Sequence, residues 1–202
     1  MAEKEEGGTY LTIAKDGSGR VIEKMSRFLS FAFHVESSQQ ARDIIRRLTN
    51  EYHDARHVCW AYMIGYQRTD YQSNDNGEPS GTAGKPILGQ INSFGLTDVL
   101  VVVVRYFGGI KLGTPGLIAA YREAAWQALS DSGTRVVTRC VRLCISVGYE
   151  SLDKVMKLIK DKGLRIVNQD IEMDCKMEIE IPIVNEEEVK GRLSVIPNLR
   201  MN

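Results

Sequence analysis

Residues 74–121 read NDNGEPSGTAGKPILGQINSFGLTDVLVVVVRYFGGIKLGTPGLIAAY, and this stretch decides the fold of the longer, N-terminal part of the chain. Two glycine-rich loops, Gly77–Gly84 and Gly108–Gly116, each lead directly into an apolar pattern with helical spacing. Between them, Val99–Val104 is a near-continuous apolar run, which predicts a strand buried on both faces. Helix starts present unpaired N–H groups and the positive end of the helix dipole. The stretch therefore predicts one anion site built from two helix starts.

Upstream and downstream of this stretch, strands and helices alternate. A capping box formed by Ser37 and Gln40 predicts a helix over about residues 38–51. A second helix is predicted over Thr82–Phe94, and a third is predicted to begin with Thr114 as its cap and to end at Gly133. The polar residues Gln67–Gly77 predict a mobile loop. The predicted strands are Thr9–Ile13, Arg20–Lys24, Phe28–Val35, His57–Tyr66 and Asp98–Arg105.

A new pattern begins in the segment Gly133–Thr138, which we interpret as the domain junction. From there the order of predicted elements is β-α-β-β-α, which favours a small α+β sandwich with its helices on one face. These elements are predicted at Arg139–Gly148, Tyr149–Lys162, Leu164–Met173, Lys176–Val184 and Glu186–Val195. The chain is thus predicted to be α+β, with a tail and first strand in residues 1–15, a first domain in 16–133 and a smaller domain in 134–202.

Composition limits the classes of function. The 202 residues include 26 basic and 26 acidic side chains, so the formal net charge is zero. Extended nonspecific coating of DNA needs a basic excess, which leaves only a local basic patch for binding nucleic acid. The four cysteines form no C-x-x-C pair, which favours free thiols in a reducing cytosol. Because no signal peptide and no apolar run of ~20 residues is present, we expect a cytoplasmic protein without a membrane span.

The second glycine loop invites comparison with a phosphate-binding P-loop, and it fails the pattern. That motif needs Lys and then Ser or Thr directly after its last glycine, whereas here Lys111 lies inside the loop. A looser backbone cradle for an anion remains, and the alternative is that the glycines only make tight turns and close packing. The residues assigned to this anion or nucleic-acid site are Gly81, Thr82, Gly84, Lys85, Arg105, Gly108, Gly109, Lys111, Gly113 and Thr114.

Catalytic candidates are few. Asp75 and Glu78 are the only acidic pair beside the glycine loops, and they could supply acid–base chemistry or hold Mg²⁺ beside a phosphate. Equally, residues 75–77 could form a turn that leaves Glu78 in solvent. His57 is a third candidate, since His57 and Cys59 share a strand face, but no orienting group is evident and an ordinary strand is favoured. Residues 53–57 (HDARH) resemble the H-E-x-x-H zinc signature without placing both histidines on one helix. We therefore expect no metal and no cofactor.

Several motifs together carry a resemblance to a known family. Residues 77–86 (GEPSGTAGKP) and 105–113 (RYFGGIKLG), with 26–28 (SRF) and 55–62 (ARHVCWAY), resemble the signature of the IMPACT family. The bacterial YigZ-type branch is the closer match. Three positions depart from the family pattern: Asn76 stands where an aspartate is usual, Pro115 where glycine is usual, and Val58 where asparagine is frequent.

The resemblance implies an N-terminal domain similar to domain 2 of ribosomal protein S5 and a ferredoxin-like C-terminal domain similar to one in elongation factors. It also implies a link to translation, because eukaryotic relatives regulate the kinase pathway that responds to amino-acid starvation. We therefore expect a non-enzymatic regulatory protein that binds RNA or a ribosome-associated protein, with its oligomeric state left open. The rival is an enzyme acting on a phosphorylated small molecule or nucleotide, and a third interpretation is a scaffold whose loops only pack.

Overall fold

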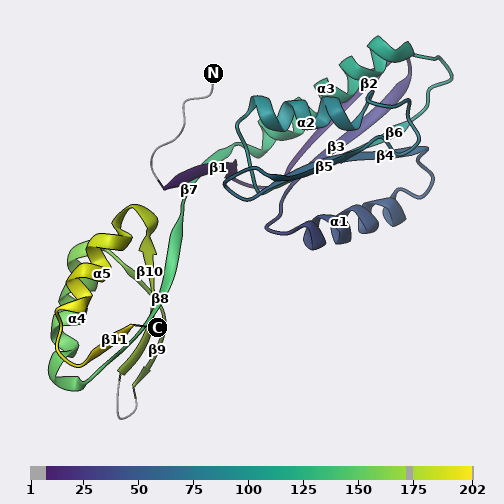
Figure 1. Ribbon diagram of the computed structural model, residues 1–202. Helices are drawn as coiled ribbons and strands as arrows, with labels where there is room; N and C mark the ends of the chain where they lie inside the picture. Colours follow the sequence, from purple (N-terminus) through teal and green to yellow (C-terminus); the bar gives the residue numbers. More distant parts are fainter. Residues whose placement is uncertain (1–7, 172–174, 202) are drawn as a thin grey trace. The chain divides into compact units, whose positions relative to one another are not determined.

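The computed structural model describes residues 8–171 and 175–201 (Figure 1). The chain divides into two compact units, Tyr10–Val137 and Thr138–Asn202, the second of which also takes in the N-terminal segment up to Thr9. Helices and strands are mixed in both units, which confirms the α+β class. The first seven residues of the expected N-terminal tail, and residues 172–174 at the end of the predicted strand Leu164–Met173, lie outside the described residues.

The larger unit is built on a five-stranded antiparallel sheet with the order β2-β3-β6-β4-β5. Helices α2 and α3 cover one face of this sheet and α1 covers the other (Figure 1). The elements are β2 (Gly17–Glu23), β3 (Ser26–His34), α1 (Ser38–Glu51), β4 (His57–Ile64), β5 (Asp70–Asn74), α2 (Gly84–Ser93), β6 (Val99–Tyr106) and α3 (Gly113–Ser132). Two short strands, β1 (Thr9–Ile13) and β7 (Thr134–Thr138), pair in a separate sheet.

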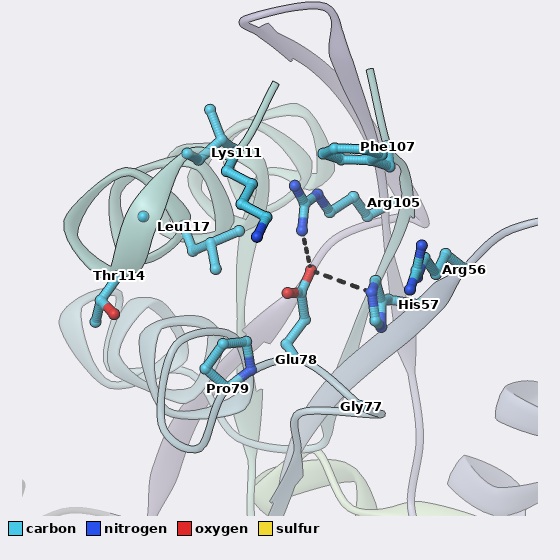
Figure 2. A pocket seen from close by; sticks show the side chains of 12 residues that line it. Arg56, His57, Gly77, Glu78, Pro79, Arg105, Phe107, Lys111, Thr114 and Leu117 are labelled. Carbon is cyan, nitrogen blue, oxygen red and sulfur yellow. Dashed lines mark hydrogen bonds and ion pairs between the residues drawn. The ribbon is translucent and has the colours of Figure 1, made fainter. Parts of the chain in front are cut away.

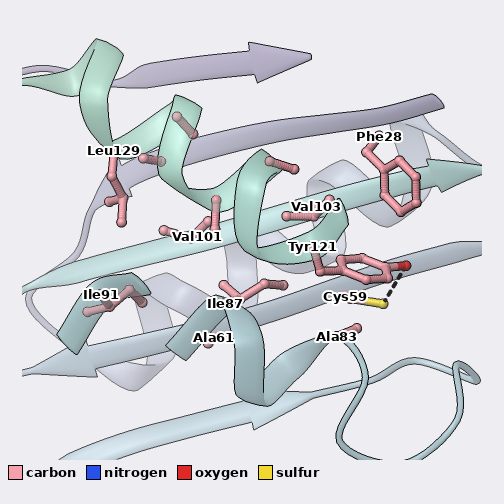
Figure 3. Packing of buried hydrophobic residues seen from close by; sticks show 14 of the residues in the cluster. Phe28, Cys59, Ala61, Ala83, Ile87, Ile91, Val101, Val103, Tyr121 and Leu129 are labelled. Carbon is pink, nitrogen blue, oxygen red and sulfur yellow. Dashed lines mark hydrogen bonds between the residues drawn. The ribbon is translucent and has the colours of Figure 1, made fainter. Parts of the chain in front are cut away.

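The central strand β6 explains the valine run. Val99, Val101 and Val103 belong to the core under α2 and α3, whereas the alternate residues Leu100, Val102 and Val104 belong to the core under α1. Successive side chains of a strand point to opposite faces, so a strand between two helical layers needs apolar residues at every position. Figure 3 shows Val101 and Val103 among the residues from α2 and α3. The prediction of a strand buried on both faces is confirmed.

The helix starts depart from the predictions in two places. Ser37 caps α1 as expected, accepting a hydrogen bond from the backbone N–H of Gln40. Thr114 does not cap α3, because the positive φ of Gly113 turns the chain into the helix one residue earlier and puts Thr114 in the first turn. The segment predicted as a mobile loop contains β5, whose polar residues suit an exposed edge strand paired with β4.

The smaller unit has the element order β-α-β-β-α-β, which is the order of ferredoxin-like domains. Its sheet order is β11-β8-β10-β9, with a core of its own between the sheet and the two helices. The elements are β8 (Cys140–Val147), α4 (Tyr149–Lys162), β9 (Arg165–Ile171), β10 (Cys175–Pro182), a 3-10 turn η1 (Ile183–Asn185), α5 (Glu186–Ser194) and β11 (Leu199–Met201). The sequence did not predict β11, because three residues are too few to show a period.

No helix among the described residues combines the length and the apolar character that crossing a bilayer requires. The four cysteines are free thiols, with Cys59 and Cys175 buried and Cys140 and Cys144 exposed.

Candidate functional site

A pocket of about 510 Å³ opens in the larger unit where β4 begins, β6 ends and α3 begins (Figure 2). Its buried lining residues, which we call the floor, include Glu78 and Arg105; its exposed lining residues, which we call the rim, include Arg56, Phe107 and Lys111. The remaining lining residues are His57, Gly77, Pro79, Leu112, Gly113, Thr114 and Leu117.

Arg105 reaches the floor because of its place in the alternation of β6. It follows Val99, Val101 and Val103 on the face covered by α2 and α3, so its side chain enters that layer at the end of the apolar stripe. Phe28 on β3 and His57 on β4 are its directly opposite neighbours across the sheet. The guanidinium carbon lies 5.4 Å from the centre of the Phe28 ring and 5.7 Å from that of Phe107. Aromatic rings therefore hold the cation in place on two sides.

Glu78 pairs with Arg105 in the floor. Its Oε1 accepts a hydrogen bond of 2.6 Å from Nη1 of Arg105 and one of 2.8 Å from the Tyr121 hydroxyl. The side chains of Arg105 and Glu78 are only 7% and 3% exposed, so two charges that would be costly alone neutralise each other. The alternative that left Glu78 in solvent is wrong, because the loop before α2 turns this carboxylate inward. Nε of Arg105 is buried and has no hydrogen-bond partner in the described part of the chain.

His57 lies at the side of the same pair. Its Nδ1 lies 2.8 Å from the carbonyl oxygen of Asn76. A carbonyl oxygen can only accept, so Nδ1 carries a proton, and in the corresponding neutral tautomer Nε2 is an acceptor. That Nε2 lies 3.9 Å from Oε1 of Glu78 on the pocket wall (Figure 2). His57 is thus oriented by the backbone, which is the orienting group that the sequence did not reveal.

The first glycine loop binds an anion, but that anion belongs to the protein itself. Asp75 accepts hydrogen bonds from the backbone N–H groups of Ala83 and Gly84 on one oxygen and of Gly81 on the other. Burial by itself would raise the pKa of Asp75, but these hydrogen bonds outweigh it, and the pKa lies below its ordinary value. Both carboxylate oxygens are engaged, which corrects the assignment of Asp75 to acid–base chemistry.

This internal anion also corrects four assignments of the predicted site. The N–H groups of Gly81 and Gly84 are occupied by Asp75 and do not line the pocket. Thr82 is buried and its hydroxyl donates to the carbonyl oxygen of Pro79. Lys85 is exposed and lies outside the lining as well. The two helix starts do not converge on one ligand, because a side chain of the chain already fills the first.

The second glycine loop divides between packing and the pocket. A Cβ on Gly108 would lie 2.1 Å from the carbonyl carbon of Met25, so this glycine is required by close approach of the β2–β3 hairpin. Gly109 has a φ of +88° and does not line the pocket either. Lys111, Gly113 and Thr114 line it, and no side chain of the described residues caps the start of α3.

Cys59 is a buried residue of the core under α2 and α3. Its Sγ lies 3.0 Å from the carbonyl oxygen of Asp75. It also lies 3.3 Å from the Tyr121 hydroxyl, and Figure 3 shows this contact. Burial raises the pKa of its thiol to about 12, with the nearby carboxylates of Glu78 and Asp75 adding to the effect. Burial likewise raises the pKa of Tyr121, so its hydroxyl stays protonated as a donor to Glu78. The favoured interpretation of His57 and Cys59 as an ordinary strand therefore holds for the thiol.

Sequence reasoning missed three residues that matter to the pocket. Arg56 and Phe107 lie on its rim, and Tyr121 holds the floor from behind. A signal for Tyr121 existed, because it lies four residues after Leu117 on α3 and thus on the same helical face. The position of Phe107 depends on how the chain leaves β6, which no local pattern reports.

The charges of the pocket favour an anion. Three cationic side chains, those of Arg56, Arg105 and Lys111, face one carboxylate, that of Glu78, and Figure 2 shows Lys111 extending towards the same space as Arg105. The excess is local, since the whole chain has no net charge. A concave, largely apolar wall with a few converging polar groups is the usual form of a ligand site.

Comparison with known proteins identifies the family. The sequence model of the Impact N-terminal domain matches residues 24–129. The chain belongs to the IMPACT family. It is 33% identical over 173 residues to the IMPACT family member YigZ of Escherichia coli (strain K12), covering 85% of each chain. It is 36% identical over 154 residues to the IMPACT family member YvyE of Bacillus subtilis (strain 168), covering 76% of this chain and 70% of YvyE.

A eukaryotic relative and a solved structure extend the comparison. The Protein IMPACT homolog of Saccharomyces cerevisiae is 35% identical over 123 residues, covering 57% of this chain and 47% of the yeast protein. A crystal structure described as that of a hypothetical protein matches with a TM-score of 0.73 and 30% identity, covering 96% of both chains. All twelve residues that line the pocket fall within the range matched by the IMPACT N-terminal domain.

Two departures from the IMPACT pattern have a structural account. Asn76 has a φ of +42°, a region that asparagine tolerates, and its Oδ1 accepts the backbone N–H of Val58 as an aspartate oxygen would. Pro115 lies in the first turn of α3, where a missing N–H costs no helical hydrogen bond. Neither substitution removes a group from the pocket.

Proposed function

We propose that this IMPACT-family protein is a non-enzymatic, translation-linked regulatory protein that binds RNA or a ribosome-associated partner through the pocket at the start of α3. The observation that carries the proposal is the local cationic excess over a paired floor: Glu78 is neutralised by Arg105, while Lys111 and Arg56 stay available on the rim. Phosphate groups are the anions that RNA presents, and Lys and Arg side chains bind them.

The exposed ring of Phe107 adds to this proposal. Single-stranded RNA is bound by phosphate contacts together with stacking of its unpaired bases on aromatic side chains. Phe107 is 44% exposed and lies on the rim beside the cations, so a base and a phosphate of the same strand would find partners within one site. A scaffold whose loops only pack would not need an exposed aromatic ring at this place.

The test is binding of labelled single-stranded RNA, followed by fluorescence anisotropy over a series of salt concentrations. We expect the logarithm of the affinity to fall with the logarithm of the salt concentration, with a slope of about −0.7 for each phosphate engaged. Lys111→Glu should weaken binding by at least about tenfold, since a charge reversal costs more than the loss of one contact of about 1.4 kcal/mol. Lys85→Glu is the matched control, because Lys85 is an exposed lysine of the same unit outside the pocket.

Co-sedimentation with ribosomes at low salt tests the wider form of the proposal. We expect the protein in the ribosomal pellet, and less of the Lys111→Glu variant than of Lys85→Glu. If neither ribosomes nor free RNA retain the protein even at low salt, the proposed function is wrong.

One observation favours a second candidate, an enzyme acting on a phosphorylated small molecule or nucleotide. His57 is held by Asn76 with Nε2 facing the pocket, which is the arrangement of a general base. A thermal-shift panel of nucleotides and phosphorylated metabolites, with and without Mg²⁺, would find such a ligand. Stabilisation by one small ligand, followed by turnover that His57→Gln abolishes while binding persists, would place this candidate first.

A further inference from the structure

We propose that the pocket holds the terminal phosphate monoester of an RNA strand, with the end base stacked on Phe107. This inference rests on the proposed RNA binding and names the part of the RNA that the site takes. Four features of the pocket carry it: the unpartnered donor in its floor, its charge, the start of α3 and the place of the aromatic ring.

The floor holds a buried donor that the described residues leave without a partner. Nη1 of Arg105 is used by Glu78, whereas Nε is buried and has no partner among residues 8–171 and 175–201. The Nε edge of a guanidinium forms the pair of parallel hydrogen bonds that binds phosphate oxygens. Figure 2 shows the guanidinium pointing into the pocket. An internal phosphodiester continues into the strand on both sides and would have to bury both, whereas a terminal phosphate enters by itself.

The charge of the pocket matches a terminal phosphate better than an internal one. A phosphate monoester carries a charge of about −1.5 to −2 near neutral pH, because its second pKa is about 6, whereas an internal phosphodiester carries a single negative charge. Once Glu78 and Arg105 have neutralised each other, Lys111 and Arg56 are the two cations left on the rim. Neither forms an ion pair within the described part of the chain.

The start of α3 completes the set of donors. Gly113 and Thr114 line the pocket, and within the described chain no side chain caps this 20-residue helix. A helix start attracts an anion through its unpaired N–H groups and its dipole. Here it lies beside the unpartnered donor of Arg105, so two independent features of the pocket favour the same kind of ligand.

The Phe107 ring lies on the rim, where the nucleoside attached to a bound terminal phosphate would be placed. Phe107 stacks over Arg105 at 5.7 Å on one side and is exposed on the rim. A base stacked on this ring would be joined to a phosphate that enters the floor. The stacking does not select one base, since every base offers an aromatic face.

The experiment compares strand ends by fluorescence anisotropy. One short single-stranded RNA is prepared with a 5′-phosphate, with a 3′-phosphate and with hydroxyl groups at both ends, each labelled away from the end under test. We expect one phosphorylated form to bind about tenfold more tightly than the hydroxyl form, which corresponds to a difference of about 1.4 kcal/mol in binding free energy. The two phosphorylated arms decide between a 5′ and a 3′ end.

Three variants locate the effect. Lys111→Ala should remove the preference for the phosphorylated end, and Phe107→Ala should weaken binding of all forms by about fivefold or more, as expected for one lost stacking contact. Lys111 and Phe107 are exposed, and circular dichroism with thermal unfolding checks that each variant keeps the fold, above all Phe107→Ala, whose ring also contacts Arg105. Lys85→Ala should leave both the affinity and the preference unchanged.

The outcomes separate this inference from the function on which it rests. Equal affinity for all three RNAs, lost in Lys111→Ala, would overturn the terminal-phosphate inference and leave RNA binding in place. A free mononucleotide that competes as well as the phosphorylated RNA would also overturn it, since the strand would then contribute nothing. Absence of binding to every RNA at low salt would overturn the proposed function itself.

Discussion

At the scale of single residues, the buried ion pair of Glu78 and Arg105 stabilises the fold as well as lining the pocket. Each is more than nine-tenths buried, and each is the other's neutralising partner. Removing one partner of a buried pair leaves a charge without compensation, which costs about 3–5 kcal/mol. The pair therefore ties the shape of the pocket floor to the stability of the larger unit.

We expect Glu78→Ala to lower the free energy of unfolding of the larger unit by about 3 kcal/mol, because Arg105 is left buried and unpaired. Urea denaturation followed by circular dichroism measures this change. The double variant Glu78→Leu with Arg105→Met should recover most of the loss, since two apolar side chains need no partner. A single-variant cost below about 1 kcal/mol would contradict the importance of the pair.

Asp75 predicts a dependence of stability on pH. Its pKa is lowered in the folded protein from the ordinary value of 3.8, so its stabilising effect is present above pH 3.8 and is lost as the pH falls through the folded value. We expect Asp75→Asn to cost about 2 kcal/mol at pH 7, as for loss of a good helix cap, because an amide cannot accept all three N–H groups. Urea unfolding at several pH values should show the difference from the natural protein shrinking below pH 3.8. A difference that stays constant down to pH 3 would contradict this role.

At the scale of elements, two successive glycines fix the loop between β6 and α3. Gly108 is required by a close backbone contact, and Gly109 is required by its positive φ. Gly108 packs against the backbone of Met25 and Ser26, and its N–H donates to the Ser26 hydroxyl. Gly109 has open space around it but a φ of +88°. The loop thus carries Lys111 and the start of α3 to the pocket on a backbone that the β2–β3 hairpin fixes.

We expect Gly108→Ala to destabilise the larger unit by about 3 kcal/mol or more, because the added methyl group meets backbone atoms that cannot move aside. Gly109→Ala is the matched comparison and should cost only about 1–2 kcal/mol, the price of a positive φ for an L-residue. Thermal unfolding of both variants measures the difference. Equal costs would show that contact with the hairpin does not matter.

Helix α3 also protects one edge of the larger sheet, that of strand β2. The backbone N–H groups of Ser18 and Arg20 on edge strand β2 donate to Asp131 and Gln127, both on α3. Unpaired N–H groups on an edge strand invite pairing with another chain. Side chains of α3 therefore protect this edge as well as covering the core.

At the scale of the whole molecule, two separate cores predict two separate responses to mutation. The larger unit has apolar clusters on both faces of its sheet, and the smaller unit has one between its sheet and α4 and α5. Each cluster lies within one unit. Because stability is then a property of each unit, a single unfolding free energy does not describe the chain.

We expect Ile179→Ala in β10 to destabilise the smaller unit by about 2–5 kcal/mol, as for a buried isoleucine replaced by alanine. Val101→Ala in β6 should instead destabilise the larger unit. Hydrogen exchange read out by mass spectrometry should show faster exchange in residues 138–201 for the first variant and in residues 10–137 for the second. A uniform increase over both units in either variant would contradict their independence.

The sequence by itself determined most of the elements. The valine run, the capping box and the alternating strands set β6, α1 and the class of both units, because these signals depend on neighbours within a few residues. The polar edge strand β5 and the three-residue β11 escaped, since their stability comes from pairing with β4 and β8 and not from their own residues.

For the site, the sequence predicted one anion at two helix starts, and the tertiary structure shows that Asp75 occupies the first of them. Because Asp75 fills the first start, the pocket lies at the second, where Lys111, Arg105 and Phe107 share one lining. Glu78, for which exposure to solvent was one alternative, is buried because Arg105, near the end of β6, faces it. Backbone preferences depend on neighbouring residues, so they can be predicted from the sequence. Which charge pairs with which partner depends on the strands and loops that lie together in the folded chain, so only the tertiary structure decides it.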